Sequence, residues 1–151
     1  MFRGIANLTI DDKGRMAVPT RHREGLVGET NLPIVLTIDT ESPCLLLYPL
    51  HEWELIEQKL AALPSFNAAA RRIQRLLIGH ATEVELDSHS RVLIPTILRD
   101  YAGLDKKAML VGQGNKFEIW SESRWQSARD LWLAEQQGGE ALPQELTGLS
   151  L

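Results

Sequence analysis

The chain has 151 residues, with 16 Lys or Arg against 20 Asp or Glu, so its formal net charge at pH 7 is −4. Because phosphate neutralisation needs a surplus of positive charge, this balance excludes a protein that coats nucleic acid in bulk and leaves room only for a small basic patch. The composition, 44% hydrophobic and 24% charged, is typical of a soluble globular protein, and the apolar stretches are far shorter than the roughly 20 residues of a membrane helix. We therefore expect a cytoplasmic protein without a membrane partner.

The chain contains two copies of one pattern. Residues 10–24 align with residues 86–100 without a gap, and residues 44–53 align with 116–125, each ending in Trp. The identities in the first alignment are Asp11 with Asp87, Arg15 with Arg91, Pro19 with Pro95, Thr20 with Thr96 and Arg23 with Arg99. The sequence therefore predicts two repeats, each of about 50 residues or more.

In chain order, each repeat begins with two strands around a polar turn, continues with a short helix that starts after a Pro, and then has two more strands. The strands of the first repeat are predicted at 5–10, 15–18, 32–38 and 44–49. Those of the second repeat are predicted at 82–86, 91–94, 108–112 and 116–120. The short helices are predicted at 20–28 and 96–104.

Three longer helices are predicted from apolar spacing and capping residues. They cover 51–64, 67–80 with Ser65 as its cap, and 122–137 with Ser121 as its cap. We accordingly expect a first repeat with its closing helix, a linking helix, a second repeat with its closing helix, and a disordered tail rich in Gly, Pro and polar residues. The corresponding boundaries are 1–64, 65–80, 81–137 and 138–151.

The turn between the first two strands carries the pattern Asp-x-x-x-Arg in both repeats, as Asp11 to Arg15 and as Asp87 to Arg91. The carboxylate can accept backbone N–H groups of the turn or pair with the Arg, and either arrangement would hold the guanidinium in place. Arg reads guanine through two parallel hydrogen bonds, and a two-stranded ribbon fits the DNA major groove. On spacing alone, a purely structural hairpin explains the pattern equally well.

The first repeat begins with a basic segment. Residues 1–24 contain five Arg or Lys and three Asp or Glu, for a net charge of +2. Lys13 lies on the turn itself, and Arg21 and Arg23 follow shortly after it as possible donors to phosphates. Arg3 belongs to the same basic segment. The local charge therefore favours contact with nucleic acid.

Several segments together resemble the MraZ family of bacterial transcriptional regulators. They are MFRG at the start, DDKGR followed by an apolar strand and Pro, SRVLIPTILRDYAGL in the second repeat, and EIW followed by Trp125. The resemblance implies an α+β, mainly β protein with two tandem AbrB-like swapped-hairpin β-barrel domains and flanking helices. It also implies a ring-shaped homo-oligomer, associated with the nucleoid, that binds short repeated sites in the promoter of the cell-division and cell-wall gene cluster, including its own gene.

The same resemblance assigns the candidate DNA-binding residues. The family's DNA-contacting loop corresponds here to Asp11, Lys13, Gly14 and Arg15, its counterpart in the second repeat to Asp87 and Arg91, and Arg3 is added from the basic segment. One position departs from the family, because Ser90 stands where a Gly usually precedes the second Arg. If that position needs a positive φ, the second turn is predicted to be strained or differently shaped.

Other functions have weaker support. The four His residues show no metal-ligand spacing, and Cys44 lies in an apolar run typical of a packed side chain, so we expect no enzyme, metal or cofactor. An enzyme site assembled between subunits would lack an identifiable nucleophile and base. A further alternative is an antitoxin-like module of the same fold that neutralises a protein partner through its C-terminal helix and tail.

Overall fold

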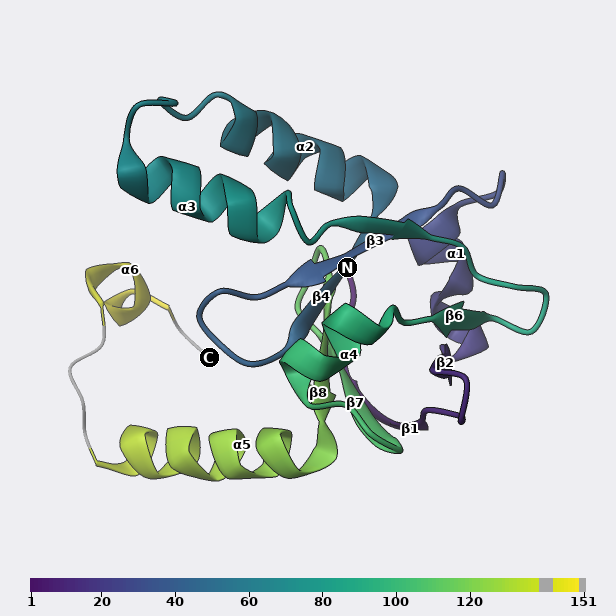
Figure 1. The fold of residues 1–151 in the computed structure, drawn as a ribbon. Coiled ribbons are helices and arrows are strands. Elements are labelled where there is room, and N and C mark those ends of the chain that lie inside the picture. Colours follow the sequence, from purple (N-terminus) through teal and green to yellow (C-terminus); the bar gives the residue numbers. More distant parts are fainter. Residues whose placement is uncertain (139–142, 150–151) are drawn as a thin grey trace.

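A computed structural model describes residues 1–138 and 143–149 and shows an α+β protein whose strand pairings are all antiparallel (Figure 1). Every predicted strand segment contains a strand, which confirms that part of the sequence interpretation. In chain order the elements are β1 (Ile5–Thr9), β2 (Arg15–Ala17), the 3-10 helix η1 (Thr20–His22), α1 (Arg23–Val27), β3 (Ile34–Ile38), β4 (Leu45–Pro49), α2 (Leu50–Ala61), α3 (Ala68–Leu77), β5 (Thr82–Val84), β6 (Arg91–Leu93), α4 (Thr96–Ala102), β7 (Lys107–Gly112), β8 (Phe117–Ser121), α5 (Glu122–Gln137) and α6 (Gln144–Thr147).

The strands of the two repeats are interleaved. Six of them form one sheet in the order β1-β7-β8-β4-β3-β5, and β2 pairs with β6 in a separate two-stranded ribbon. Thus β1 of the first repeat pairs with β7 of the second, and β5 of the second repeat pairs with β3 of the first. The first hairpin of each repeat is thereby shared with the other repeat, and both repeats contribute to one structural unit.

The main core lies between the six-stranded sheet and the inner face of the ribbon. Met16 and Val92, the central residues of β2 and β6, are completely buried there. Their neighbours in the strands point outward because side chains alternate along a strand. Burial of the central pair therefore fixes which side chains the ribbon exposes.

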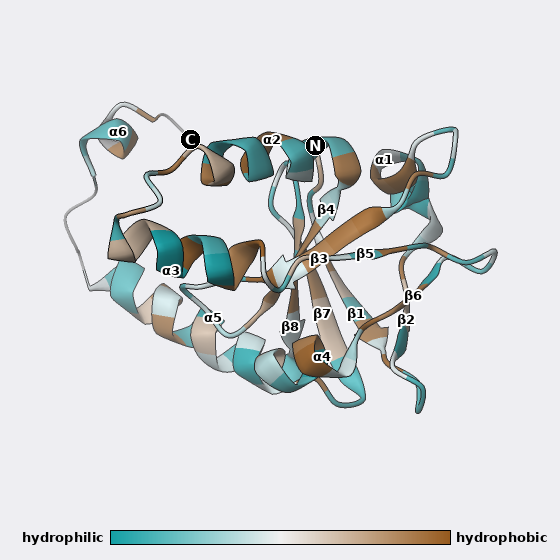
Figure 2. Cartoon of the chain, turned by 45° about the horizontal axis from the view of Figure 1, so that its top comes forward, coloured by the Kyte–Doolittle hydropathy of each residue, from teal (hydrophilic) through white to brown (hydrophobic). Residues whose placement is uncertain are grey.

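Helices cover the other face of the sheet. The hairpin of α2 and α3 packs over β3, where Trp53 and Leu60 join Val35 in a second apolar cluster (Figures 1 and 2). Because β3 is covered on both faces, it is buried at all five positions and brown along most of its length in Figure 2. Farther along the same face, α5 covers β7 and β8 through Trp125.

The capping predictions had different outcomes. Ser121 caps α5, as predicted, because its Oγ accepts a hydrogen bond from the N–H of Arg124 at 3.1 Å. The prediction for Ser65 was wrong: Asn67 caps α3, its side-chain oxygen accepting from the N–H groups of Ala69 and Ala70. The helix begins two residues later than Ser65 would allow, and Asn is as good a cap as Ser.

The C-terminal segment after α5 falls partly outside the described residues, which leave out 139–142 and 150–151. Within the predicted tail, Gln144–Thr147 forms the short helix α6. Among the residues that the structure describes, no helix is both long enough and apolar enough to cross a membrane.

Candidate nucleic-acid interface

The first turn is organised by one carboxylate. Asp11 Oδ1 accepts hydrogen bonds from the backbone N–H of Lys13 at 3.0 Å and of Arg15 at 2.9 Å, and Oδ2 accepts from Arg15 Nε at 2.8 Å. The backbone closes the turn through Gly14 N–H to Asp11 O at 2.9 Å. The carboxylate therefore binds the turn backbone and the guanidinium at once, which confirms both contacts predicted for the Asp of this pattern.

The second turn repeats this arrangement. Asp87 Oδ1 accepts from the N–H groups of His89 at 2.8 Å and Arg91 at 2.9 Å, and Oδ2 accepts from Arg91 Nε at 2.9 Å. Ser90 N–H donates to Asp87 O at 3.0 Å, as Gly14 does in the first turn. The two turns thus have the same hydrogen-bond framework despite their different central residues.

Both Asp residues are held as carboxylates by these contacts. The backbone N–H of Arg15 is the main cause that keeps the pKa of Asp11 below its ordinary value. The backbone N–H of Arg91 is the main cause that lowers the pKa of Asp87 to about 2. Since hydrogen bonds to the charged form favour it, both turns keep their ion pair at neutral pH.

The position before each Arg requires a left-handed backbone. Gly14 has φ +89°, and Ser90 has φ +59°, which a residue with a Cβ adopts at a cost. The expectation of a strained or differently shaped turn at Ser90 is met by the strained backbone, while the hydrogen-bond framework is unchanged. Ser90 is buried and its Oγ accepts a hydrogen bond from Arg23 Nη1 at 2.9 Å, which helps to hold it in this conformation.

Each turn is also supported by an Arg from the other repeat. Arg23 Nη1 donates to Asp87 O at 2.8 Å as well as to Ser90 Oγ, and its Nη2 donates to Asn31 Oδ1. Arg99, the equivalent residue of the second repeat, lies directly on Gly14, where an added Cβ would come within 2.7 Å of its Cζ. Three of the five N–H donors of the Arg23 guanidinium are thus used within the protein, and its contact with a phosphate stays a prediction.

The ribbon places both ion pairs on one exposed face. Because Met16 and Val92 point into the core, Arg15, Ala17, Arg91 and Leu93 point outward. Arg15 lies opposite Leu93, and Arg91 lies opposite Ala17, so the two Arg residues are about 7 Å apart along the ribbon. The turns themselves lie at opposite ends of the ribbon, because the strands are antiparallel and each starts immediately after its turn.

The outer ends of the two guanidinium groups remain available. The side chains of Arg15 and Arg91 are 32% and 34% exposed. Within the described part of the chain, their hydrogen bonds to protein run through Nε, and no Nη atom of either residue has a protein partner. A guanidinium fixed through Nε can still form two parallel hydrogen bonds through its Nη atoms with one planar acceptor pair.

The remaining candidates differ in position. Lys13 is exposed on the first turn, next to the ion pair. Arg3 is also exposed, but it precedes β1, whereas the turn follows that strand, so about 25 Å of extended chain separates it from Asp11. The structure therefore gathers Asp11, Lys13, Gly14 and Arg15 at one end of the ribbon, Asp87 and Arg91 at the other, and leaves Arg3 apart.

Comparison with known proteins shows the family. The model of the family described as "MraZ protein, putative antitoxin-like" matches residues 1–76 and 77–134. The chain belongs to the MraZ family. It is 58% identical over 152 residues to proteins named transcriptional regulator MraZ from Legionella pneumophila and Coxiella burnetii, and 54% identical over 151 residues to one from Alkalilimnicola ehrlichii, in each case over the full length of both chains. The resemblance drawn from the motifs is confirmed.

Sequence reasoning missed one residue of the exposed ribbon face. Leu93 is 54% exposed and lies beside Arg15, so the ribbon offers an apolar side chain next to that guanidinium. The alternation of side chains along β6 could have indicated this exposure, because Leu93 lies two residues after Arg91 and therefore on the same face. The segment was interpreted only as an apolar strand, so the outward Leu was not distinguished from core residues.

Proposed function

We propose that this protein is a sequence-specific DNA-binding regulator of transcription. The observation that carries the proposal is the pair of guanidinium groups, each fixed by a carboxylate through Nε and open at Nη, on one exposed face of a two-stranded ribbon. The names of the curated relatives support regulation of transcription, and they do not describe a class of enzymes.

In this proposal the ribbon enters the major groove. Arg15 and Arg91 would each donate two hydrogen bonds to O6 and N7 of a guanine, with Asp11 and Asp87 holding them in position before DNA binds. Lys13 would contact a phosphate or a base edge beside the first turn, and Gly14, buried against Arg99, would supply the positive φ that shapes this turn. Leu93 is suited to contact the C5-methyl group of a thymine next to the base read by Arg15.

A single ribbon contacts few base pairs, so we propose that affinity depends on several copies. Binding of a homo-oligomeric ring to a row of short sites would make each contact after the first intramolecular. Exposed apolar side chains on α4 and α5, among them Ile97 and Leu131, offer surfaces for such assembly. We propose the promoter of the cell-division and cell-wall gene cluster, including the protein's own gene, as the target, with the protein associated with the nucleoid in the cytoplasm.

We also propose that the architecture is of the AbrB-like swapped-hairpin type. The ribbon and the six-stranded sheet share one core, which supports two AbrB-like swapped hairpins closed into a barrel. The segments 1–64, 65–80, 81–137 and 138–151 remain our proposed division into repeats, linking helix and tail.

The proposal is tested by a gel-shift titration with the DNA upstream of the protein's own gene, compared with a shuffled sequence of equal length, at two salt concentrations. We expect tight binding to the upstream DNA, weak binding to the shuffled DNA, and a loss of affinity for both at higher salt. Lys13→Ala should lower the salt dependence while preserving the preference between the two DNAs. Equal affinity for both DNAs would contradict sequence-specific recognition.

An antitoxin-like module is the second candidate, because the matching family carries that description. In this alternative the exposed apolar residues near the end of α5, Leu131 and Leu133, would bind a protein partner. Purification from the native organism distinguishes the two: a stoichiometric protein partner without DNA binding favours the antitoxin-like module.

A further inference from the structure

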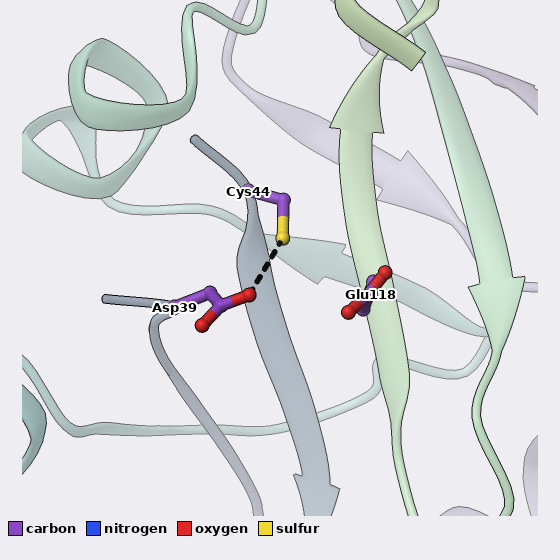
Figure 3. Close-up of side chains that lie close together, drawn as sticks. All are labelled: Asp39, Cys44 and Glu118. Atoms are coloured by element: carbon purple, nitrogen blue, oxygen red, sulfur yellow. Dashed lines mark hydrogen bonds between the residues drawn. The ribbon is translucent and has the colours of Figure 1, made fainter. Parts of the chain in front are cut away.

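A buried thiol lies between two carboxylates on the side of the sheet that carries the helices. Asp39 follows β3, Cys44 precedes β4, and Glu118 is in β8 (Figure 3). The N–H of Asp39 donates to the carbonyl of Cys44 at 3.0 Å, and the pairing of Leu46 with Glu118 places Glu118 and Cys44 on the same face. As a result, one ligand atom from each of the three residues lies within 4.8 Å of the other two.

The distances suit a tetrahedral cation. Cys44 Sγ lies 3.7 Å from Asp39 Oδ2, and Figure 3 shows both carboxylates beside the sulfur. Sulfur and oxygen ligands of one tetrahedral Zn²⁺ are about 3.5 Å apart, given the usual bond lengths. The three ligand atoms lie within 4.8 Å of one another, so any pair farther apart than about 3.5 Å must approach for all three to bind one ion.

Each carboxylate is oriented by a hydrogen bond through its other oxygen. Asp39 Oδ1 accepts from the N–H of Glu41 at 3.1 Å, and Glu118 Oε1 accepts from Trp120 Nε1 at 2.9 Å. The hydroxyl of Tyr101 donates to the carbonyl of Asp39 and holds the same loop. Such outer contacts are typical of metal ligands, because they leave one oxygen of each carboxylate directed at the ion.

The only positive charge of the protein that acts noticeably on the Cys44 thiol within the described residues is that of Lys116, which opposes the two carboxylates. Among the described residues, neither Asp39 nor Glu118 forms a salt bridge. Burial, and next to it the charges of Glu118 and Asp39, raise the pKa of the Cys44 thiol, so the sulfur stays protonated without a cation. A divalent cation would reverse this balance, since it favours the thiolate and pairs with both carboxylates.

We propose that Asp39, Cys44 and Glu118 bind one thiophilic divalent cation of the Zn²⁺ class. Binding releases the thiol proton to solvent, forms the bond from the ion to sulfur, and leaves a fourth coordination position for water. Access is through the partly exposed carboxylates, because Cys44 itself is completely buried. This site is independent of the DNA-binding face, so its test does not rest on the proposed function.

The test uses the full-length, tag-free protein, stripped with a chelator and titrated with Co²⁺ as a probe and with Zn²⁺ as a competitor. We expect one Co²⁺ per chain, a thiolate-to-metal charge-transfer band, and loss of the band on addition of Zn²⁺. Cys44→Ser should abolish the band. Asp39→Asn and Glu118→Gln should each weaken Co²⁺ binding by about 10–100-fold or more, as expected for loss of a functional metal contact.

Exposed acidic residues elsewhere provide matched controls. Asp105→Asn and Glu135→Gln remove the same charge and should leave Co²⁺ affinity unchanged. Circular dichroism of every variant checks that it is folded, and Glu118→Gln, which preserves the shape of a partly exposed side chain, remains informative if Cys44→Ser does not fold. Absence of the band, or a band that is insensitive to both carboxylate variants, would overturn the proposal.

Discussion

The two turns of the ribbon have the same framework and different exposed chemistry. Both use an Asp carboxylate to hold two backbone N–H groups and one Arg Nε, within 0.2 Å of the same distances. Between Asp and Arg, the first turn exposes Asp12 and Lys13 and the second exposes Ser88 and His89, whereas Gly14 and Ser90 are buried. The framework therefore depends on the Asp, the Arg and a positive φ, and the exposed positions are free to differ.

The residues that hold each Arg in place are thus distinct from the neighbouring residues that could add contacts to DNA. The shared framework indicates that Arg15 and Arg91 are presented in the same way, so differences in DNA contact between the two ends must come from neighbouring residues. Lys13 adds an ammonium donor at the first turn only, although the neighbouring Asp12 balances its charge. We therefore expect the first end to contribute more to affinity than the second.

The largest expected effect comes from removing the first guanidinium. Arg15→Ala should weaken binding to the upstream DNA by about 1–3 kcal/mol per bidentate contact and should relax the preference for one base. The same change at Arg91 measures the contribution of the second end, with gel-shift affinity at fixed salt as the readout. If Arg15→Ala is folded and binds the upstream DNA as tightly as the parent, the assignment of Arg15 is wrong.

The cross-repeat support of the turns is tested at Arg23. Arg23→Met removes the hydrogen bonds to the Asp87 carbonyl and to Ser90 Oγ, although the carbonyl keeps the N–H of Ser90, and should lower the free energy of unfolding by about 1–3 kcal/mol. Hydrogen exchange should increase at the second turn, although the substitution is in the first repeat. Arg21→Met, an exposed neighbour, is the control, and equal exchange in both variants would contradict the cross-repeat role.

The backbone difference between the turns can be reversed by two substitutions. Gly14→Ala forces a Cβ into a left-handed conformation against the guanidinium of Arg99 and should cost about 1–2 kcal/mol of stability. Ser90→Gly relieves that conformation but loses the hydrogen bond from Arg23, so its net effect should be within about 1 kcal/mol of zero. Urea unfolding of both variants measures the difference, and equal losses would contradict this explanation.

The smallest expected effect is a loss of folding stability at acidic pH. In the unfolded chain both carboxyls titrate near the ordinary value of 3.8, whereas the folded pKa of Asp87 is about 2 and that of Asp11 is also lowered. Their contribution to stability is therefore present above pH 3.8 and is lost as the pH falls toward 2. A carbon-detected NMR titration of the folded protein should give a midpoint near 2 for Asp87; a midpoint at or above 3.8 would contradict the proposed hydrogen-bond network.

Local features of this protein were predictable from sequence, and long-range pairings were not. The repeat, the turns and the Asp11–Arg15 pair follow from residues close together in the chain, whose spacing carries the information. In contrast, β1 pairs with β7, a strand far away in the sequence. The alternation of side chains along a strand indicates its buried face but not its neighbouring strand. For the same reason the contact of Arg23 with Asp87 was missed, although the alignment of Arg23 with Arg99 marked both positions.

The exposure of Leu93 on the outer face of the ribbon was missed for a similar reason. Leu93 belongs to an apolar run, and its exposure is fixed only when Val92 packs into the core opposite Met16. A strand of three residues is too short for its sequence pattern alone to show which side chains point outward. At the second turn the local sequence also allowed a different shape, which the structure does not show. Ser90 keeps the same framework because Arg23 of the other repeat donates a hydrogen bond to its Oγ.

The antiparallel pairing of β2 with β6 has a consequence for the kind of operator this ribbon suits. It relates the two ends of the ribbon by an approximate twofold axis, but Leu93 lies beside Arg15 where Ala17 lies beside Arg91. A DNA-binding surface with true twofold symmetry suits a palindrome, whereas under the proposed function this one would distinguish the two directions along the duplex. Each protomer would therefore bind DNA with a defined polarity, and identical protomers placed side by side in one orientation would match direct repeats.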